Sequence, residues 1–234
     1  MTLLGLELLK LRRTLVWPVV WIMPLIPALI DAAIFRNERF ADAAWDDVLS
    51  NGLTIWFLLL MPLVLSLLVA QVMHPEHAGG WRLHFAAPRP RVQVLAAKLG
   101  LLLLLSLLML ALVLFTVAAG TMTLGLSDQP DWGLFVSHAL AGWLGSLGLL
   151  LLTFLVGLRF SSFLAPLGLG VAGMVIGFVG INSPQFGPWW PWTLPTLATQ
   201  PPVGLAMTEP ILLSAALSLL ALTLAWWEVS RRDA

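Results

Sequence analysis

The sequence predicts an all-α membrane protein with six transmembrane helices and, before them, a helix that lies in the membrane interface. Hydrophobic residues make up 59% of the 234 residues and charged residues only 10%, whereas a soluble domain carries about 25% charged residues. Because so few charges cannot cover a water-exposed surface, most of the surface must face lipid. The apolar runs are continuous, without the alternation of membrane β-strands, which favours helices over a barrel.

The first expected element is an amphipathic helix over residues 1–14, which begins MTLLGLELLK. Its leucines form a stripe at helical spacing, and its basic residues would lie near anionic headgroups. No short apolar run with a cleavage site is present, so the segment is expected to be retained. Alternatively it extends the first membrane helix, although Pro18, Pro24 and Pro27 disfavour one straight helix. The charged residues assigned to the interfacial helix are Glu7, Lys10, Arg12 and Arg13.

Six apolar runs follow within residues 15–234, and a helix needs about 20 such residues to cross the membrane. The first run, 15–35, holds the three prolines and Asp31, which is expected to reach outward or to cap a polar cavity. The last run, 211–228, is shorter and ends at Glu228, which can extend to the interface. The other four contain no Asp, Glu, Lys or Arg and cover residues 53–73, 99–126, 135–158 and 163–181.

The basic residues predict the orientation, because Lys and Arg are concentrated in cytoplasmic loops. Every Lys and Arg except Arg36 and Arg39 lies in the termini or in the loops after the second and fourth spans. Both termini and residues 74–98 are therefore expected in the cytoplasm of a multi-pass protein of the plasma membrane.

The expected outer loop, residues 182–210, has six prolines before Glu209 and tryptophans at positions 189, 190 and 192. Little regular helix is expected through its Pro-rich part, since each proline removes an amide donor. One interpretation is an aromatic belt that anchors a re-entrant or surface-lying segment. The other is an apolar lip where a hydrophobic substrate leaves.

Several kinds of chemistry are excluded. The only lysines are Lys10 and Lys98, and neither follows a glycine, so the chain has no P-loop for ATP. There is no cysteine, and Pro75 between His74 and His77 argues against a metal site there. The zero net charge gives no reason to expect nucleic acid.

Glycines recur on the fifth predicted span, where residues 173 and 177 form a GxxxG pattern. Without Cβ atoms, helices approach closely and gain van der Waals contact. The contact is either inside one subunit or at a seam between two subunits, and the sequence leaves both open. The glycines assigned to dimer or helix packing are Gly168, Gly170, Gly173, Gly177 and Gly180.

Residues 74–98, HPEHAGGWRLHFAAPRPRVQVLAAK, are the most polar stretch of the chain and lie between two apolar runs. Trp81 and Phe85 at i and i+4 would form one apolar face of a short helix, which Pro88 ends. Lys98 and Arg91 are expected to face the headgroups at the start of the third span. This pattern is typical of a docking element.

The run EHAGGWRLHFAAPRPR resembles the cytoplasmic motif of ABC-2 type transporter permeases, roughly E…G-T-[WL]-x-x-L-L-x-x-P-x-x-R ahead of a K-[LI]. Trp81 and Pro88 have the family spacing, Arg91 follows three residues later, and Lys98 with the next leucine ends the unit. The acidic residue is offset by about one position, and Gly80 stands where Thr or Ser is common. Among these permeases, those of bacteriocin or lantibiotic immunity and export are most similar.

The resemblance implies a half-transporter with the type V exporter-like fold, in the bacterial plasma membrane, that exports a hydrophobic or amphipathic substrate such as a peptide. A second permease chain, identical or related, and two copies of a separate ABC ATPase subunit would complete it. ATP and Mg²⁺ would bind the ATPase, and this chain would hold no cofactor and catalyse no reaction. The residues implied to couple to the ATPase are Glu76, Gly79, Gly80, Trp81, Arg82, Leu83, Phe85, Pro88 and Arg91.

Three alternatives stay open at this point. A haem-exporter-like permease of cytochrome biogenesis would also have six spans. An intramembrane enzyme could use His138 and Ser146, which lie two helical turns apart. A scaffold or receptor subunit would have no transport pathway.

Overall fold

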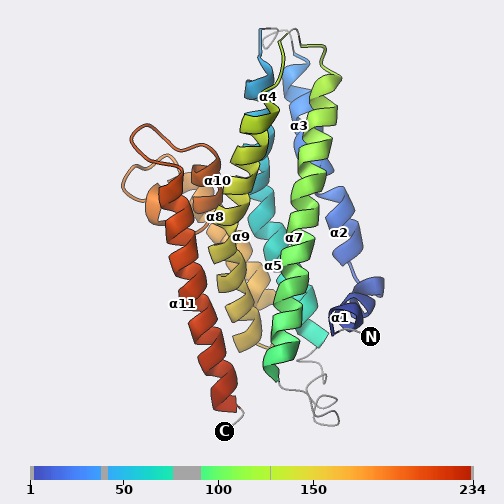
Figure 1. Cartoon of the computed structure of the whole chain (residues 1–234), viewed down its shortest axis with the longest axis vertical. Helices are drawn as coiled ribbons and strands as arrows, with labels where there is room; N and C mark the ends of the chain where they lie inside the picture. Colours follow the sequence, from blue (N-terminus) through green and yellow to red (C-terminus); the bar gives the residue numbers. More distant parts are fainter. Residues whose placement is uncertain (1–2, 38–41, 76–90, 127, 233–234) are drawn as a thin grey trace.

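The structure is a computed structural model and describes residues 3–37, 42–75, 91–126 and 128–232. These residues form an elongated bundle of helices that contains no strand (Figure 1). Both chain termini lie toward the same end of the bundle, which we call the terminal end, and the opposite end is the distal end. The expected all-α class is confirmed.

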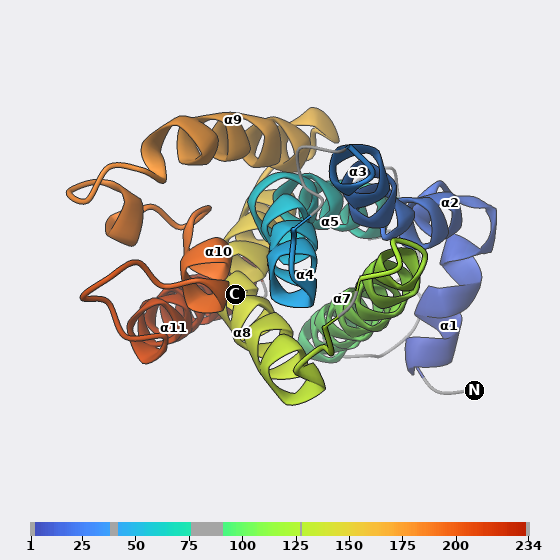
Figure 2. The same cartoon turned by 90° about the horizontal axis from the view of Figure 1, so that it is seen from above.

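The chain begins with α1 (Leu3–Lys10) and a 3₁₀ turn (Leu11–Arg13) at the terminal end. The chain is extended at Thr14, so α1 is not a continuation of the first span. Figures 1 and 2 show that α1 lies across the long axis of the bundle, beside α2 and α7.

The first span is interrupted. Helix α2 (Val16–Ile22) ends in a turn at Met23 and Pro24, and α3 (Leu25–Phe35) continues toward the distal end. Proline lacks the amide hydrogen that an uninterrupted helix needs at this position. Helix α3 packs beside α7, so the two ends of the first span share the same neighbour.

The second span occupies the centre of the bundle (Figure 2). It consists of α4 (Trp45–Thr54), a π-helical stretch (Ile55–Leu60) and α5 (Met61–Pro75). The helix begins at Trp45 rather than at residue 53, because Asp47 accepts a hydrogen bond from the Ala44 amide at 3.0 Å and caps the first turn.

Three further long helices complete the bundle: α7 (Arg91–Met122), α8 (Trp132–Arg159) and α11 (Thr208–Arg232). Together with the first two spans, they make five helices long and apolar enough to cross a membrane among the described residues. The remaining predicted span is α9 (Leu164–Gly180), with 17 residues. At 1.5 Å per residue it is about 25 Å long, at the short limit for crossing.

The segment between α9 and α11 turns back into the bundle. After a 3₁₀ turn (Gly187–Trp189), the six residues of α10 (Leu194–Thr199) are all buried. They pack against α8 and α11. A Cβ atom on Gly145 of α8 would lie 3.0 Å from the Leu194 carbonyl oxygen, so the absence of a side chain there lets α10 approach. The expectation of little regular helix in this loop was therefore wrong for α10.

The three tryptophans of this loop do not share one environment. Trp189 is 71% exposed, whereas Trp192 is 3% exposed and belongs to the hydrophobic core. Trp190 stacks on Trp192 at 5.3 Å between ring centroids, and its indole donates a 3.0 Å hydrogen bond to the Gly173 carbonyl. Only part of the cluster therefore has the exposure that an aromatic belt requires.

Candidate coupling site

The predicted coupling residues lie mostly outside the described residues. These are Glu76, Gly79, Gly80, Trp81, Arg82, Leu83, Phe85 and Pro88. The structure describes both flanks of the segment: α5 ends at Pro75 and α7 begins at Arg91, both at the terminal end (Figure 1). The segment is therefore joined to the bundle through the chain of these two helices.

A buried ion pair lies beside these flanks. Lys98, in the second turn of α7, is 1% exposed, and Glu7 of α1 is 5% exposed. The Lys98 Nζ atom lies 2.7 Å from Glu7 Oε2 and donates a 3.0 Å hydrogen bond to the Val72 carbonyl in the last turns of α5. The other carboxylate oxygen of Glu7 lies 2.6 Å from the Lys10 Nζ atom. We call Glu7, Lys98 and the Val72 carbonyl the basal clamp.

The basal clamp corrects two expectations. Lys98 does not face the headgroups, and Glu7 does not lie on an exposed polar face. Both are buried because α1 packs against α7, with Leu4 next to Gly100. A buried ammonium group is stable only when a carboxylate or carbonyl replaces its lost hydration. Lys10 and Arg12 remain exposed, as residues near headgroups would be.

One signal in the sequence pointed toward the clamp. Glu7 is the only acidic residue among the first 30 residues, and it lies in a leucine-rich helix. A single acid in such a segment needs a basic partner when the helix packs against a neighbour. The pairing with Lys98 joins residues 91 positions apart, and no local pattern could identify which lysine it was.

The clamp ties three elements together at one point. Charge-assisted hydrogen bonds at 2.7–3.0 Å are short and strong, and they connect α1, the end of α5 and the start of α7. A displacement of either flank of residues 76–90 would therefore be passed to α1 as well. Through α1 it reaches the first span, because α2 follows after the short turn at Thr14.

The glycine face of α9 packs within the chain. A Cβ atom on Gly173 would clash with the indole of Trp192, and one on Gly170 would clash with the side chain of Ser66 in α5. The absence of side chains lets α9 approach the second span and the buried tryptophan. These two glycines therefore serve contacts inside one subunit.

The other three glycines assigned to packing differ among themselves. Gly180 lies against the ring of Phe186, where a Cβ atom would be 2.5 Å from the nearest ring carbon. A Cβ atom on Gly177 would make a tight contact of 3.3 Å with Trp192 and contacts of 3.4–3.5 Å with the indole of Trp190. Nothing lies within 4 Å of the Cβ position of Gly168, so this glycine alone of the five faces open space.

The pair His138 and Ser146 does not form a catalytic arrangement. Both lie on α8, eight residues apart, which is about 12 Å along the helix axis. The Ser146 hydroxyl donates a 2.7 Å hydrogen bond to the Trp143 carbonyl of its own helix. A base must lie within about 3 Å of its nucleophile, so these residues do not act together.

The comparison with protein families agrees with the fold. The family described as ABC-2 family transporter protein matches residues 3–180, from α1 through the coupling segment to the end of α9. No curated protein and no solved structure matches the chain. The chain belongs to the ABC-2 transporter family and is a membrane permease subunit of an ABC transporter, a transport subunit rather than a catalytic one.

Proposed function

We propose that this permease exports a hydrophobic or amphipathic substrate, such as a peptide, and is driven by a separate ATPase subunit that docks on residues 74–98. The basal clamp is the observation that supports the docking of an ATPase on residues 74–98. It places buried, charge-assisted contacts at both flanks of the docking segment and links them to α1. In the plasma membrane of a bacterium, the terminal end would face the cytoplasm.

The proposed cycle uses these connections. Binding of ATP closes a pair of ATPase subunits, which press on two permease chains through residues 74–98. The movement of α5 and α7 then passes through Lys98 and Glu7 to α1 and the first span. Helix α9 follows because it packs against α5. Such coupling requires that the docking segment make different contacts in the two states of the ATPase.

The proposal is tested by co-expressing the permease with each ABC ATPase subunit encoded in the same genome. The expected result is copurification and an ATPase rate that rises on reconstitution with the permease. A Trp81→Ala, Arg82→Glu variant is expected to lose both. Its control is Arg36→Glu, which reverses an exposed charge at the distal end and should change neither.

Two results would overturn the proposal. One is undiminished ATPase binding and stimulation by the Trp81→Ala, Arg82→Glu variant. The other is substrate movement by the purified permease in vesicles that contain neither the ATPase nor ATP. Thermal unfolding of each variant shows that the compared proteins are folded.

A further inference from the structure

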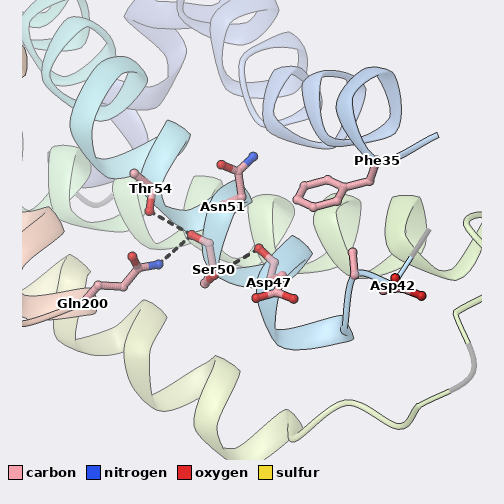
Figure 3. A pocket seen from close by; sticks show the side chains of 8 residues that line it. Phe35, Asp42, Asp47, Ser50, Asn51, Thr54 and Gln200 are labelled. Atoms are coloured by element: carbon pink, nitrogen blue, oxygen red, sulfur yellow. Dashed lines mark hydrogen bonds between the residues drawn. The ribbon is translucent and has the colours of Figure 1, made fainter. Parts of the chain in front are cut away.

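Two adjoining hollows lie at the distal end of the molecule. The first has a volume of about 570 Å³ and is lined mainly by polar side chains of α4 and of the chain before it (Figure 3). The second, of about 790 Å³, is lined mainly by apolar side chains from α9, α10, the second span and the chain on both sides of α10. Thr54 and Gln200 line both hollows. We therefore treat them as one cavity, the distal groove.

The polar half of the distal groove is acidic. Asp42 and Asp47 line it, together with the neutral side chains of Ser50 and Asn51. Within the described parts of the chain, neither carboxylate has a Lys, Arg or His partner within 4.0 Å. This half therefore attracts a positive charge and repels an anion.

A hydrogen bond crosses the boundary between the two halves of the groove. Gln200 donates a 2.8 Å hydrogen bond from its side-chain amide to the Ser50 carbonyl, and Thr54 donates its hydroxyl to the same carbonyl at 2.9 Å (Figure 3). The Gln200 bond joins the end of α10 to α4, whereas the Thr54 bond lies within α4. The two halves of the groove thus keep a fixed relation to each other.

The apolar half contains one polar group that the protein leaves unused. Thr196 is 5% exposed and lines this half, but its hydroxyl has no hydrogen-bond partner in the described structure. Its neighbours Thr193 and Thr199 donate their hydroxyls to backbone carbonyls at 2.7 Å. A buried hydroxyl without a partner is unfavourable. The Thr196 oxygen is itself covered, so a bound molecule gains this hydrogen bond only when the side chain turns toward the groove.

We propose that the distal groove binds an amphipathic cation. Its apolar body would lie against Leu58, Phe178 and Leu197, and a polar group would hydrogen bond to Thr196. Its ammonium or guanidinium group would face Asp42 and Asp47. As a statement about the class of transported substrate, this inference rests on the proposed function. Binding to the groove itself requires no ATPase.

The groove suits this class better than two simpler ones. A hydrocarbon chain alone would satisfy neither the Thr196 hydroxyl nor the two carboxylates. An anionic amphiphile would bring its charge toward Asp42 and Asp47, where like charges repel. An amphipathic cation matches both halves of the cavity.

The test uses the purified permease alone, in nanodiscs of phosphatidylcholine. The probe is a rhodamine-labelled pentapeptide, Lys-Leu-Phe-Leu-Lys amide, followed by fluorescence polarisation with empty nanodiscs subtracted. Analogues in which both lysines are replaced by glutamine, or the three apolar residues by serine, separate the two halves of the site. Both analogues are expected to bind more weakly than the probe.

Variants locate the binding. Asp42→Asn is expected to weaken probe binding about threefold, as for an exposed charge pair. Thr196→Val is expected to weaken it about fivefold without lowering thermal stability, because its hydroxyl has no partner to lose. The matched control is Asp46→Asn, which removes an exposed carboxylate of the same helical turn that does not line the groove. It should leave binding unchanged.

The inference is overturned if Asp42→Asn and Thr196→Val bind the probe as well as Asp46→Asn does. It is also overturned if an analogue with glutamates in place of the lysines binds more tightly. Neither result affects ATPase docking. Conversely, if no ATPase docks on residues 74–98, binding of the probe and its dependence on Asp42 and Thr196 are still expected.

Discussion

Glu7→Gln is expected to destabilise the protein strongly, because Glu7 is the carboxylate that both Lys98 and Lys10 contact. The substitution keeps the size of the side chain and removes its charge. It therefore tests the electrostatic part of the basal clamp without opening a cavity in the packing between α1 and α7.

The magnitude follows from the burial of both partners. Glu7 and Lys98 are at least nine-tenths buried, and removing one partner of such a pair costs about 3–5 kcal/mol. Glutamine retains an oxygen that can accept a hydrogen bond, so we expect the lower end, about 3 kcal/mol. That is roughly a hundredfold change in the unfolding equilibrium. Lys98→Met should cost less, because Glu7 keeps its contact with Lys10.

The assay is reversible unfolding of the purified protein in mixed micelles, with helix content followed by circular dichroism as sodium dodecyl sulfate is added. The double variant Glu7→Gln, Lys98→Met completes a cycle that isolates the coupling between the two residues. Glu209→Gln, at an exposed position in the first turn of α11, is the matched control. It should change the free energy of unfolding by less than about 0.5 kcal/mol.

A Glu7→Gln variant no less stable than Glu209→Gln would refute the reasoning. So would a coupling energy near zero in the double-mutant cycle. Either result would mean that α1 is held to the bundle by its leucines alone, and that the clamp carries no force between the flanks of the docking segment.

Three further predictions concern packing and buried hydrogen bonds. Gly173→Ala should destabilise the protein by about 1–3 kcal/mol through overpacking. Gly168→Ala, where space is open, should be neutral or stabilise the protein by up to about 1 kcal/mol. Thermal unfolding of the two variants in detergent compares them directly. Asn51→Leu removes the 2.7 Å hydrogen bond to buried Asp31 and should cost about 1–3 kcal/mol, and Asp31→Asn in the same protein should recover part of that loss. Ser214→Ala removes the hydroxyl that accepts from the α8 backbone at 2.9 Å, and a loss of about 1 kcal/mol is expected by denaturant titration; unchanged stability would contradict this role.

The class and the number of apolar helices were accessible from the sequence. In a membrane every backbone amide must be satisfied internally, so a run of about 20 apolar residues has few alternatives to a helix. The start of the second span was less visible, because residues 45–52 carry two aspartates, a serine and an asparagine. Their helix is amphipathic, with Asp47, Ser50 and Asn51 turned toward the distal groove.

Long-range contacts account for what the sequence could not show. Helix α10 is only six residues long, with a proline in its first turn, where proline is tolerated. It is helical because α8 and α11 bury it. Of the two expectations for Asp31, the outward one was wrong, because Asp31 is 2% exposed and accepts a hydrogen bond from Asn51. That amide also lines the groove.

The π-helical stretch Ile55–Leu60 has a consequence for the second span as a whole. A wider turn holds more residues than an α-helical turn, so the two halves of this span are out of phase with one another. Deleting one residue there would rotate α4 by about 100° relative to α5. Asn51 would swing away from Asp31, and the Ser50 carbonyl would swing away from Gln200. The one extra residue of the π-helical turn therefore sets the rotation of α4 relative to α5. With this rotation, the polar side of α4 faces the groove while α5 packs against α9.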